Sequence, residues 1–262
     1  MGLDENSINW IKSYLTSRQQ QLKFKNYMST TTPVEAGVPQ GSILGPLLFL
    51  CFTNDLAEDF EGLCKMFAYA DDTQLIIEAP NQEELEHKIK EALKTAQKWY
   101  SENTMKNNIG KTEFLIFNNH NNKKFDIHMQ DQGKAITLKP KSHIKTLGIF
   151  IDDNLNWSKQ VKIVKRKTMN AVRNLHRINH LLPKQLRLNL YNAIVTPLFN
   201  YCDIIWNGCN AKERKNLQIV QNFAAKSITG HRKYDSATDS LCQLQLLNLH
   251  QRRKLHKVVF VH

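Results

Sequence analysis

Two adjacent carboxylates stand between two apolar segments of this 262-residue sequence. Asp71 and Asp72 follow "KMFAYA" and precede "TQLII", and they close the tetrapeptide that starts with Tyr69 and Ala70. Both flanking segments are rich in β-forming residues, which predicts a hairpin with the aspartates at its tip. Aspartates at such tips commonly act as turn residues whose side chains bond to their own backbone. The alternative is a cation site, because two neighbouring carboxylates repel each other unless a cation neutralises them.

The apolar flanks favour the cation site. The runs "MFAYA" and "LIIEA" are apolar at nearly every position, which predicts strands that are buried on both faces. Mg²⁺ commonly takes one or two carboxylates together with substrate phosphates. Two such ions about 4 Å apart can activate an attacking hydroxyl group and stabilise the leaving oxygen in phosphoryl transfer. We therefore expect the hairpin to carry half of a metal site.

The segments that must position this hairpin mix helices and strands. Alternating apolar residues predict strands, and apolar residues three and four apart predict helices. The segment 43–60 is apolar nearly all round, so we expect a buried helix there, and 81–103 is predicted as an amphipathic helix. The remaining expected elements are a helix over 7–18, a strand over 20–29, a glycine-containing loop over 35–42, and strands over 107–117, 124–129, 134–139 and 143–152.

The second part of the chain is predicted to be helical throughout. The helix expected over 157–178 has an apolar face that includes Val161, Val164 and Thr168. Trp99 and Trp157 are expected in the core or at a junction between domains. Further helices are expected over 183–196, 200–206 and 211–229 and from 247 onward. The fold class is therefore predicted as α+β, with a mixed part over 1–152 and an all-helical part over 153–262.

The net charge of +12 is concentrated in the second part. Residues 1–120 contain 11 Lys and Arg against 16 Asp and Glu, whereas residues 121–262 contain 25 against 8. A strongly basic region suits a polyanion such as nucleic acid, and the alternative is a solvated basic surface without a partner. The helix over 157–178 carries a set of cations largely outside its apolar face, namely Lys159, Lys162, Arg166, Arg173 and Arg177.

Composition excludes several other classes of protein. No apolar run reaches the roughly 18–20 residues that span a bilayer, and the first residues lack the pattern of a signal peptide. The five cysteines include no C-x-x-C pair, and the ten histidines show no spacing typical of a metal site. We expect an intracellular protein, in the nucleus or the cytoplasm, that is neither secreted nor bound to a membrane. Nothing in the sequence indicates an oligomeric state.

Several motifs in order resemble one enzyme family. The stretch "GVPQGSILGPLLF", followed by "FAYADDT", resembles motifs B and C of reverse transcriptases, above all those of non-LTR (LINE-type) retrotransposons. The likeness continues through "SYLTSRQQ" before them, "NNIGKTEFLIF" as motif D, and "KTLGIFIDDNLNW" as the primer-grip region. It extends into "LYNAIVTPLFNYCDIIW" and "LQIVQNFAAKSITG", which resemble the thumb. The resemblance covers nearly the whole chain in collinear order.

The resemblance implies roles for individual residues. Asp71 and Asp72 match the catalytic metal ligands, and Lys111 matches the motif D lysine that acts on the departing pyrophosphate. For Lys111 the alternative is an ordinary exposed charge, and a phosphate-binding P-loop is excluded because Met105 stands where that motif needs glycine. The implied contacts to nucleotide, template and primer are Pro39, Gln40, Gly41 and Ser42 of motif B, Tyr69 and Ala70 of motif C, and Leu147 and Gly148 of the primer grip.

The resemblance also implies the architecture and the reaction. Residues 1–152 match a right-hand polymerase palm, an antiparallel sheet backed by helices, and residues 153–262 match a helical thumb. The implied activity is RNA-directed DNA polymerisation, a two-metal nucleotidyl transfer from a dNTP to a primer 3′-hydroxyl. The implied partners are an RNA template, a DNA primer and dNTPs, and the implied cofactor is Mg²⁺, with Mn²⁺ as an alternative.

One departure from the family pattern bears on activity. No stretch of this sequence matches the motif A carboxylate or the fingers, so the palm is predicted to be truncated. Catalytic groups that act as a unit fail together, so little polymerase activity is expected of this chain alone. The alternative function is that of a catalytically inactive retrotransposon relic that binds nucleic acid through its basic part.

Overall fold

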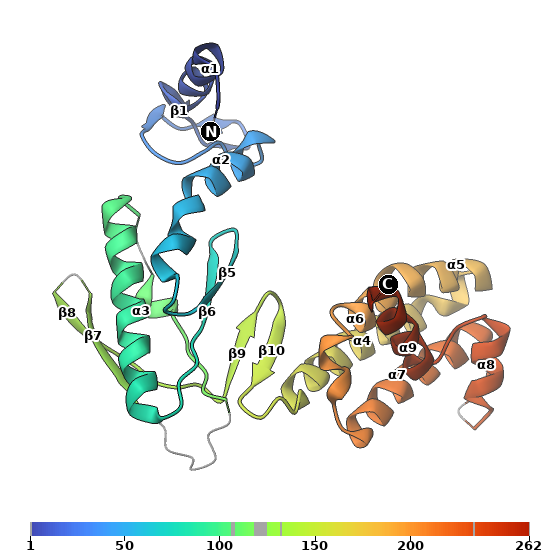
Figure 1. Ribbon diagram of the computed structural model, residues 1–262. Coiled ribbons are helices and arrows are strands. Elements are labelled where there is room, and N and C mark those ends of the chain that lie inside the picture. The colour runs from blue at the N-terminus through green and yellow to red at the C-terminus, as the bar shows by residue number, and fades with distance from the viewer. Residues whose placement is uncertain (1, 106–107, 118–124, 132, 233, 262) are drawn as a thin grey trace. The chain divides into compact units, whose positions relative to one another are not determined.

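The computed structural model describes residues 2–105, 108–117, 125–131, 133–232 and 234–261 (Figure 1). The chain divides into two compact units, Met1–Ile109 and Gly110–His262. Helices alternate with small antiparallel sheets, and every sheet in the described part of the chain has two strands. The α+β class is therefore confirmed. The unit boundary reflects packing alone, and the functional division into 1–152 and 153–262 stays a prediction.

The first unit begins with α1 (Glu5–Leu15) and a group of short strands. The Asp4 side chain accepts a hydrogen bond from the Ser7 backbone N–H at 2.9 Å, which starts the helix. In place of the single strand expected over 20–29, the chain turns back on itself. The strands are β1 (Arg18–Gln20), which pairs with β4 (Thr32–Val34), and β2 (Lys23–Phe24), which pairs with β3 (Tyr27–Met28).

The apolar segment that starts at residue 43 forms α2 (Leu44–Phe52), followed by the 3-10 helix η1 (Asn54–Phe60). The expectation that this helix is buried is wrong. Gly45 is its one buried residue, while Leu50 is 60% exposed and the preceding Ile43 is 96% exposed. Composition predicts that a helix prefers burial, but burial also requires a partner surface. The two-stranded sheets described in this unit do not form a layer broad enough to cover α2.

The core of the first unit lies where η1 and α3 (Gln82–Glu102) meet the hairpin of β5 (Lys65–Tyr69) and β6 (Asp72–Ile76). The Asn81 side chain caps α3 by accepting the Glu84 backbone N–H at 2.8 Å. Trp99 is 2% exposed and its indole N–H donates to the Asp55 carboxylate at 3.2 Å, so its predicted core position is confirmed. The buried residues of this core are Leu56, Phe60, Ala92, Ala96 and Trp99.

The second unit opens with η2 (Ile109–Lys111) and two hairpins. β7 (Ile127–Asp131) pairs with β8 (Lys134–Leu138), and β9 (His143–Thr146) pairs with β10 (Ile149–Asp152). The strand predicted over 107–117 is not formed in its described part: residues 112–117 are irregular, although the Phe114 carbonyl accepts the Lys141 N–H at 2.9 Å. A strand needs a continuous series of backbone hydrogen bonds to a partner strand, and this single bond does not provide one.

The helices of the second unit enclose its core. The two longest, α4 (Ser158–Ile178) and α7 (Ala211–Thr229), pack against each other and contribute Val161, Val164, Leu217 and Val220 to that core (Figure 1). The predicted apolar face of α4 is confirmed at Val161, Val164 and Thr168, whereas Ile178, which was also assigned to it, is 41% exposed. Trp157 is buried, as predicted. The other helices are η3 (Asn179–Leu181), α5 (Lys184–Leu190), the π-helical turn η4 (Tyr191–Val195), α6 (Thr196–Asn200), η5 (Ile205–Gly208), α8 (Ala237–Gln243) and α9 (Leu249–Val261).

Among the described residues, no helix combines the length and the apolar character that are required to cross a bilayer.

Leu217 tests how far the second unit depends on the α4–α7 contact. Its side chain is 0% exposed in the core, whereas Ile219 on the same helix is 49% exposed. We expect Leu217→Ala to lower the free energy of unfolding by about 2–5 kcal/mol, because it removes buried methyl groups and leaves a cavity. Ile219→Ala is the matched control and should cost below about 1 kcal/mol. Urea unfolding followed by tryptophan fluorescence measures both, and equal losses would contradict this description of the core.

Candidate active site

The hairpin of β5 and β6 carries the two adjacent aspartates at its tip. Tyr69 pairs with Asp72, so the loop between the strands consists of Ala70 and Asp71. Ala70 has φ +52°, a positive value of the kind that two-residue hairpin loops demand. The predicted hairpin is therefore confirmed. Its turn fixes the backbone of Asp71, and the strand pairing fixes the backbone of Asp72.

Only one face of this hairpin is packed. Met66 and Leu75, which pair across the strands, contact the core of the first unit, and the Thr73 hydroxyl lies 3.5 Å from the Tyr100 hydroxyl of α3. On the other face, Phe67 is 55% exposed and Tyr69 is 68% exposed. The expectation that both faces are buried is wrong, because β5 and β6 form a two-stranded sheet with one partner layer.

The open face carries one of the aspartates. Residues that pair across antiparallel strands project to the same face, so Asp72 shares the open face with Tyr69. Both Asp71 and Asp72 are exposed. Within the described part of the chain, no group of three or more His, Cys, Asp or Glu side chains could hold a metal ion. An all-oxygen pair suits a hard divalent cation whose remaining ligands are water and phosphate oxygens.

The loop before α2 is held by one hydroxyl group. The Ser42 side chain donates to the Pro39 carbonyl at 2.7 Å and accepts the Gly45 backbone N–H at 3.0 Å. Gly41 has φ +80°, which favours glycine, and Gln40 is exposed. A Cβ atom at Gly45 would lie 2.9 Å from the Ser42 hydroxyl oxygen, so glycine is required there as well. The four motif B residues thus form one compact turn at the helix start.

Sequence reasoning missed the side chain that braces this loop. Arg18 donates from Nε to the Leu15 carbonyl at 2.8 Å and from Nη2 to the Gly37 carbonyl. It therefore ties the loop to the end of α1. The available signal was an arginine at the end of the helix predicted over 7–18, but its second partner lies 19 residues away. A local pattern does not identify such a partner.

The β9–β10 hairpin turns at Leu147 and Gly148. Their φ values are +44° and +85°, which matches the two positive values of a type I′ turn. The Tyr201 hydroxyl donates to the Leu147 carbonyl, and a Cβ atom at Gly148 would lie 3.3 Å from the Tyr201 ring. Tyr201 was also missed as a site residue, although it belongs to the thumb-like stretch.

The predicted lysine of motif D and the two aspartates belong to different units of the chain. Lys111 is exposed and ends η2 in the second unit, whereas Asp71 and Asp72 belong to the first unit. The structure describes each unit separately, so the joint action of Lys111, Asp71 and Asp72 stays a prediction. The same holds for the roles of the motif B loop and of the primer-grip hairpin.

Five cations were predicted to bind the backbone of a nucleic acid, and four of them lie in one row along α4. We call this row the basic stripe, and it consists of Lys162, Arg166, Arg173 and Arg177. All four are exposed, and none takes part in an ion pair with the residues that the structure describes. At about 100° per residue they fall within roughly 60° of the helix circumference.

Lys159 differs from those four cations. It is half-buried, its ammonium lies 4.7 Å from the centroid of the Phe150 ring, and it contacts His143. Its side chain is therefore engaged with the β9–β10 hairpin of the same unit.

Gly148 tests the contact with Tyr201. Gly148→Ala should lower the free energy of unfolding by about 1–2 kcal/mol, because a side chain is disfavoured at positive φ, and the ring contact should add to this cost. Gly133→Ala is the matched control, since Gly133 has φ +78° and a Cβ atom there would have open space. Urea unfolding of both variants measures the difference. Equal costs would show that the contact with Tyr201 does not matter.

Comparison with known proteins identifies the family. The model for "Reverse transcriptase (RNA-dependent DNA polymerase)" matches residues 1–164. The chain is 30% identical over 260 residues to "Probable RNA-directed DNA polymerase from transposon BS" of Drosophila melanogaster, which covers 95% of this chain and 27% of that protein. It is 25% identical over 230 residues to "RNA-directed DNA polymerase from mobile element jockey" of Drosophila melanogaster, covering 84% of this chain and 25% of the relative.

A third relative agrees with these two. "Probable RNA-directed DNA polymerase from transposon X-element" of Drosophila melanogaster is 25% identical over 226 residues, covering 84% of this chain and 24% of the relative. The chain thus spans about a quarter of the length of the curated relatives it matches. No solved structure matches the chain at a significant level. The predicted resemblance to non-LTR retrotransposon enzymes is confirmed, and the chain belongs to the reverse transcriptase (RNA-dependent DNA polymerase) family.

Proposed function

We propose that this chain forms part of an RNA-directed DNA polymerase that adds dNTPs to a primer 3′-hydroxyl on an RNA template. The carrying observation is the pair Asp71 and Asp72 at the exposed tip of a packed hairpin, in a chain of this family. A tip that is anchored on one face and open on the other can hold cations while it admits a primer end. The reaction takes place inside the cell, in the nucleus or the cytoplasm.

Asp71 and Asp72 would hold Mg²⁺, or Mn²⁺ in its place. When bound, the metal supplies an activated primer hydroxyl and a counter-charge for the leaving oxygen. Asp71 is oriented by the two-residue turn and Asp72 by its pairing with Tyr69, so the backbone limits how far the two carboxylates can move. Tyr69 and Ala70 lie next to them and would contact the primer end.

The motif B turn would contact the base pair that forms. Gln40 is exposed, while Pro39 and Ser42 are held by the hydroxyl bonds described above. Gly41 lacks a side chain, so a base can approach the backbone closely. Lys111 is exposed and would neutralise the departing pyrophosphate.

The same family assignment implies a role for each of the two larger parts of the chain. Residues 1–152 would form a palm, within which the turn at Leu147 and Gly148 would grip the primer. Residues 153–262 would form a thumb that contacts the template–primer duplex. The basic stripe of α4 supports this role, because exposed and unpaired cations neutralise phosphates along a nucleic-acid backbone. Lys159 would contribute through the β9–β10 hairpin that it contacts.

Primer extension on poly(rA)/oligo(dT) with Mg²⁺ tests the assignment of the aspartates. Little synthesis is expected of this chain alone, so the assay uses the longer polymerase that contains it. In that protein Asp71→Asn should lower DNA synthesis at least about 1000-fold, because it removes one charge from a group of residues that act as a unit. Asp59→Asn, which alters an exposed aspartate of η1 in the same unit, is the matched control and should leave synthesis unchanged.

A binding measurement accompanies the activity assay. The paramagnetic effect of Mn²⁺ on the resonances of the β5–β6 hairpin should weaken in Asp71→Asn and persist in Asp59→Asn. Synthesis that survives in Asp71→Asn would contradict the proposal. So would the absence of synthesis by the unaltered longer polymerase together with a hairpin that does not respond to Mn²⁺.

Salt titration of RNA–DNA hybrid binding tests the basic stripe. Arg166→Gln together with Arg173→Gln should reduce the slope of log K against log salt by about two, since each phosphate contact contributes about 0.9. The control is Lys94→Gln together with Lys98→Gln on α3, which changes the net charge equally and should leave the slope unchanged. Equal changes in both double variants would show that net charge, and not the stripe, governs binding.

A further inference from the structure

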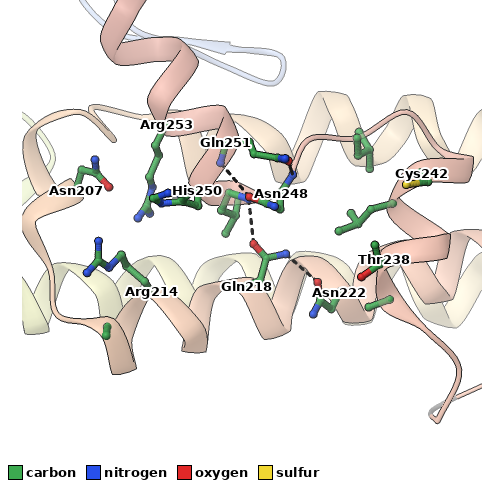
Figure 2. Close-up of a pocket in the computed structure, with 15 residues that line it drawn as sticks. Asn207, Arg214, Gln218, Asn222, Thr238, Cys242, Asn248, His250, Gln251 and Arg253 are labelled. Carbon is green, nitrogen blue, oxygen red and sulfur yellow. Dashed lines mark hydrogen bonds between the residues drawn. The ribbon is translucent and has the colours of Figure 1, made fainter.

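A pocket of about 710 Å³ opens in the second unit between α7, α8 and α9 (Figure 2). This volume lies within the range of about 300–1,000 Å³ that is typical of small-molecule sites. Two arginines and one histidine line it, namely Arg214, Arg253 and His250, and the lining residues include no Asp or Glu. The pocket therefore has a positive wall without a compensating carboxylate among its lining residues.

Arg253 is the unusual member of this wall. It is 4% exposed, its guanidinium lies 4.2 Å above the Trp206 ring, and its Nη2 atom has no hydrogen-bond partner among the described residues. Cys209 and Asp203 are the groups that favour the charged form of Arg253, but one Asp203 oxygen already accepts a bond from His256 at 2.9 Å. Burial lowers the pKa of Arg253 from its ordinary value. A buried guanidinium with an unused N–H group favours an additional acceptor.

Arg214 supplies a second guanidinium to the same space. It lies in the first turn of α7, is exposed, and forms no ion pair with a described residue. Figure 2 shows the Arg253 side chain reaching from α9 toward Arg214 and Asn207. The positive charge of Arg214 further disfavours the charged form of Arg253. Two cations that share one cavity repel each other, and an anion between them would relieve this repulsion.

The backbone adds to the positive potential of the pocket. α7 and α9 both begin at its wall: Ala211 is the first residue of α7 and Leu249 the first residue of α9. The start of a helix carries partial positive charge, which adds to the potential of the pocket although the Leu249, Gln251 and Glu213 N–H groups already donate to side chains. Gln218 links the two helices, since its Oε1 accepts the Leu249 N–H at 2.9 Å, and its Nε2 donates to Asn222 of its own helix at 2.8 Å (Figure 2). These bonds hold the walls of the pocket in place.

We propose that this pocket binds a phosphate group through Arg214 and Arg253. Guanidinium groups suit phosphate because their planar N–H donors match two of its oxygens at once. The pocket is much larger than one phosphate, so the group would arrive with an attached nucleoside, either within a nucleic-acid strand or as a free nucleotide. Neither the two aspartates nor the residues of the basic stripe line the pocket, and only the choice of nucleic acid as a source rests on the proposed function.

Binding by the whole 262-residue chain, without metal or dNTP, tests this proposal. The probes are inorganic phosphate and dTMP, followed by calorimetry, and a fluorescent single-stranded oligo(dT), followed by anisotropy. Arg214→Ala should weaken binding of at least one probe about tenfold, because a charge-assisted hydrogen bond is lost. Arg214→Lys should restore part of the affinity, since it keeps the charge without the planar donors.

Lys215→Ala is the matched control, because Lys215 neighbours Arg214, is also exposed and does not line the pocket. Its affinities should stay within about twofold of the unaltered chain. Weakened dTMP or phosphate binding in Arg214→Ala identifies a free ligand, and weakened oligo(dT) binding alone identifies a strand. Equal effects of the two alanine variants, or no effect of Arg214→Ala on any probe, would overturn the proposal. Because no catalysis is involved, a failure here is distinct from a failure of the polymerase assignment.

Discussion

Mutual repulsion between Asp71 and Asp72 is the constraint on which the candidate active site depends. A two-residue turn keeps the carboxylates adjacent, and the ladder of β5 and β6 stabilises that turn. The ladder is itself held by Met66 and Leu75 against the core that η1 and α3 provide. Packing of one face therefore offsets the cost of concentrating negative charge at the tip. Solvent at the tip screens the remaining repulsion, and a bound cation would neutralise it.

Local features of this hairpin were predictable, and its surroundings were not. Two β-rich segments around a short polar turn predict the hairpin, whereas its register, with a loop of Ala70 and Asp71, is known from the structure. Burial depends on which other layers are near, and the apolar residues do not carry that information. Phe67 and Tyr69 were expected to be covered, as was α2, but both aromatic residues are exposed and Gly45 is the one buried residue of α2. The roles of the aspartates came from the resemblance, which the family match supports.

Contacts between distant segments explain the other differences in the second unit. The apolar face of α4 follows from its periodicity, and so does the position of the basic stripe opposite to it. Lys159 departs from that stripe because Phe150 and His143 attract its side chain toward the β9–β10 hairpin. Tyr201 reaches Leu147 across 54 residues of sequence. Periodicity describes one element at a time, so it misses interactions of this kind.

Arg253 shows the corresponding cost of concentrating positive charge. In an amphipathic helix an arginine is ordinarily a solvated residue, yet here the guanidinium is stacked on Trp206 and almost fully buried. Stacking compensates for lost water on the face of the guanidinium but not at its edge, where the N–H donors require acceptors. The edge therefore determines which ligand suits the pocket. An exposed acidic tip and a partly desolvated basic pocket are then two forms of one requirement, since each concentrates charge of one sign and would be stabilised by an ion of the other.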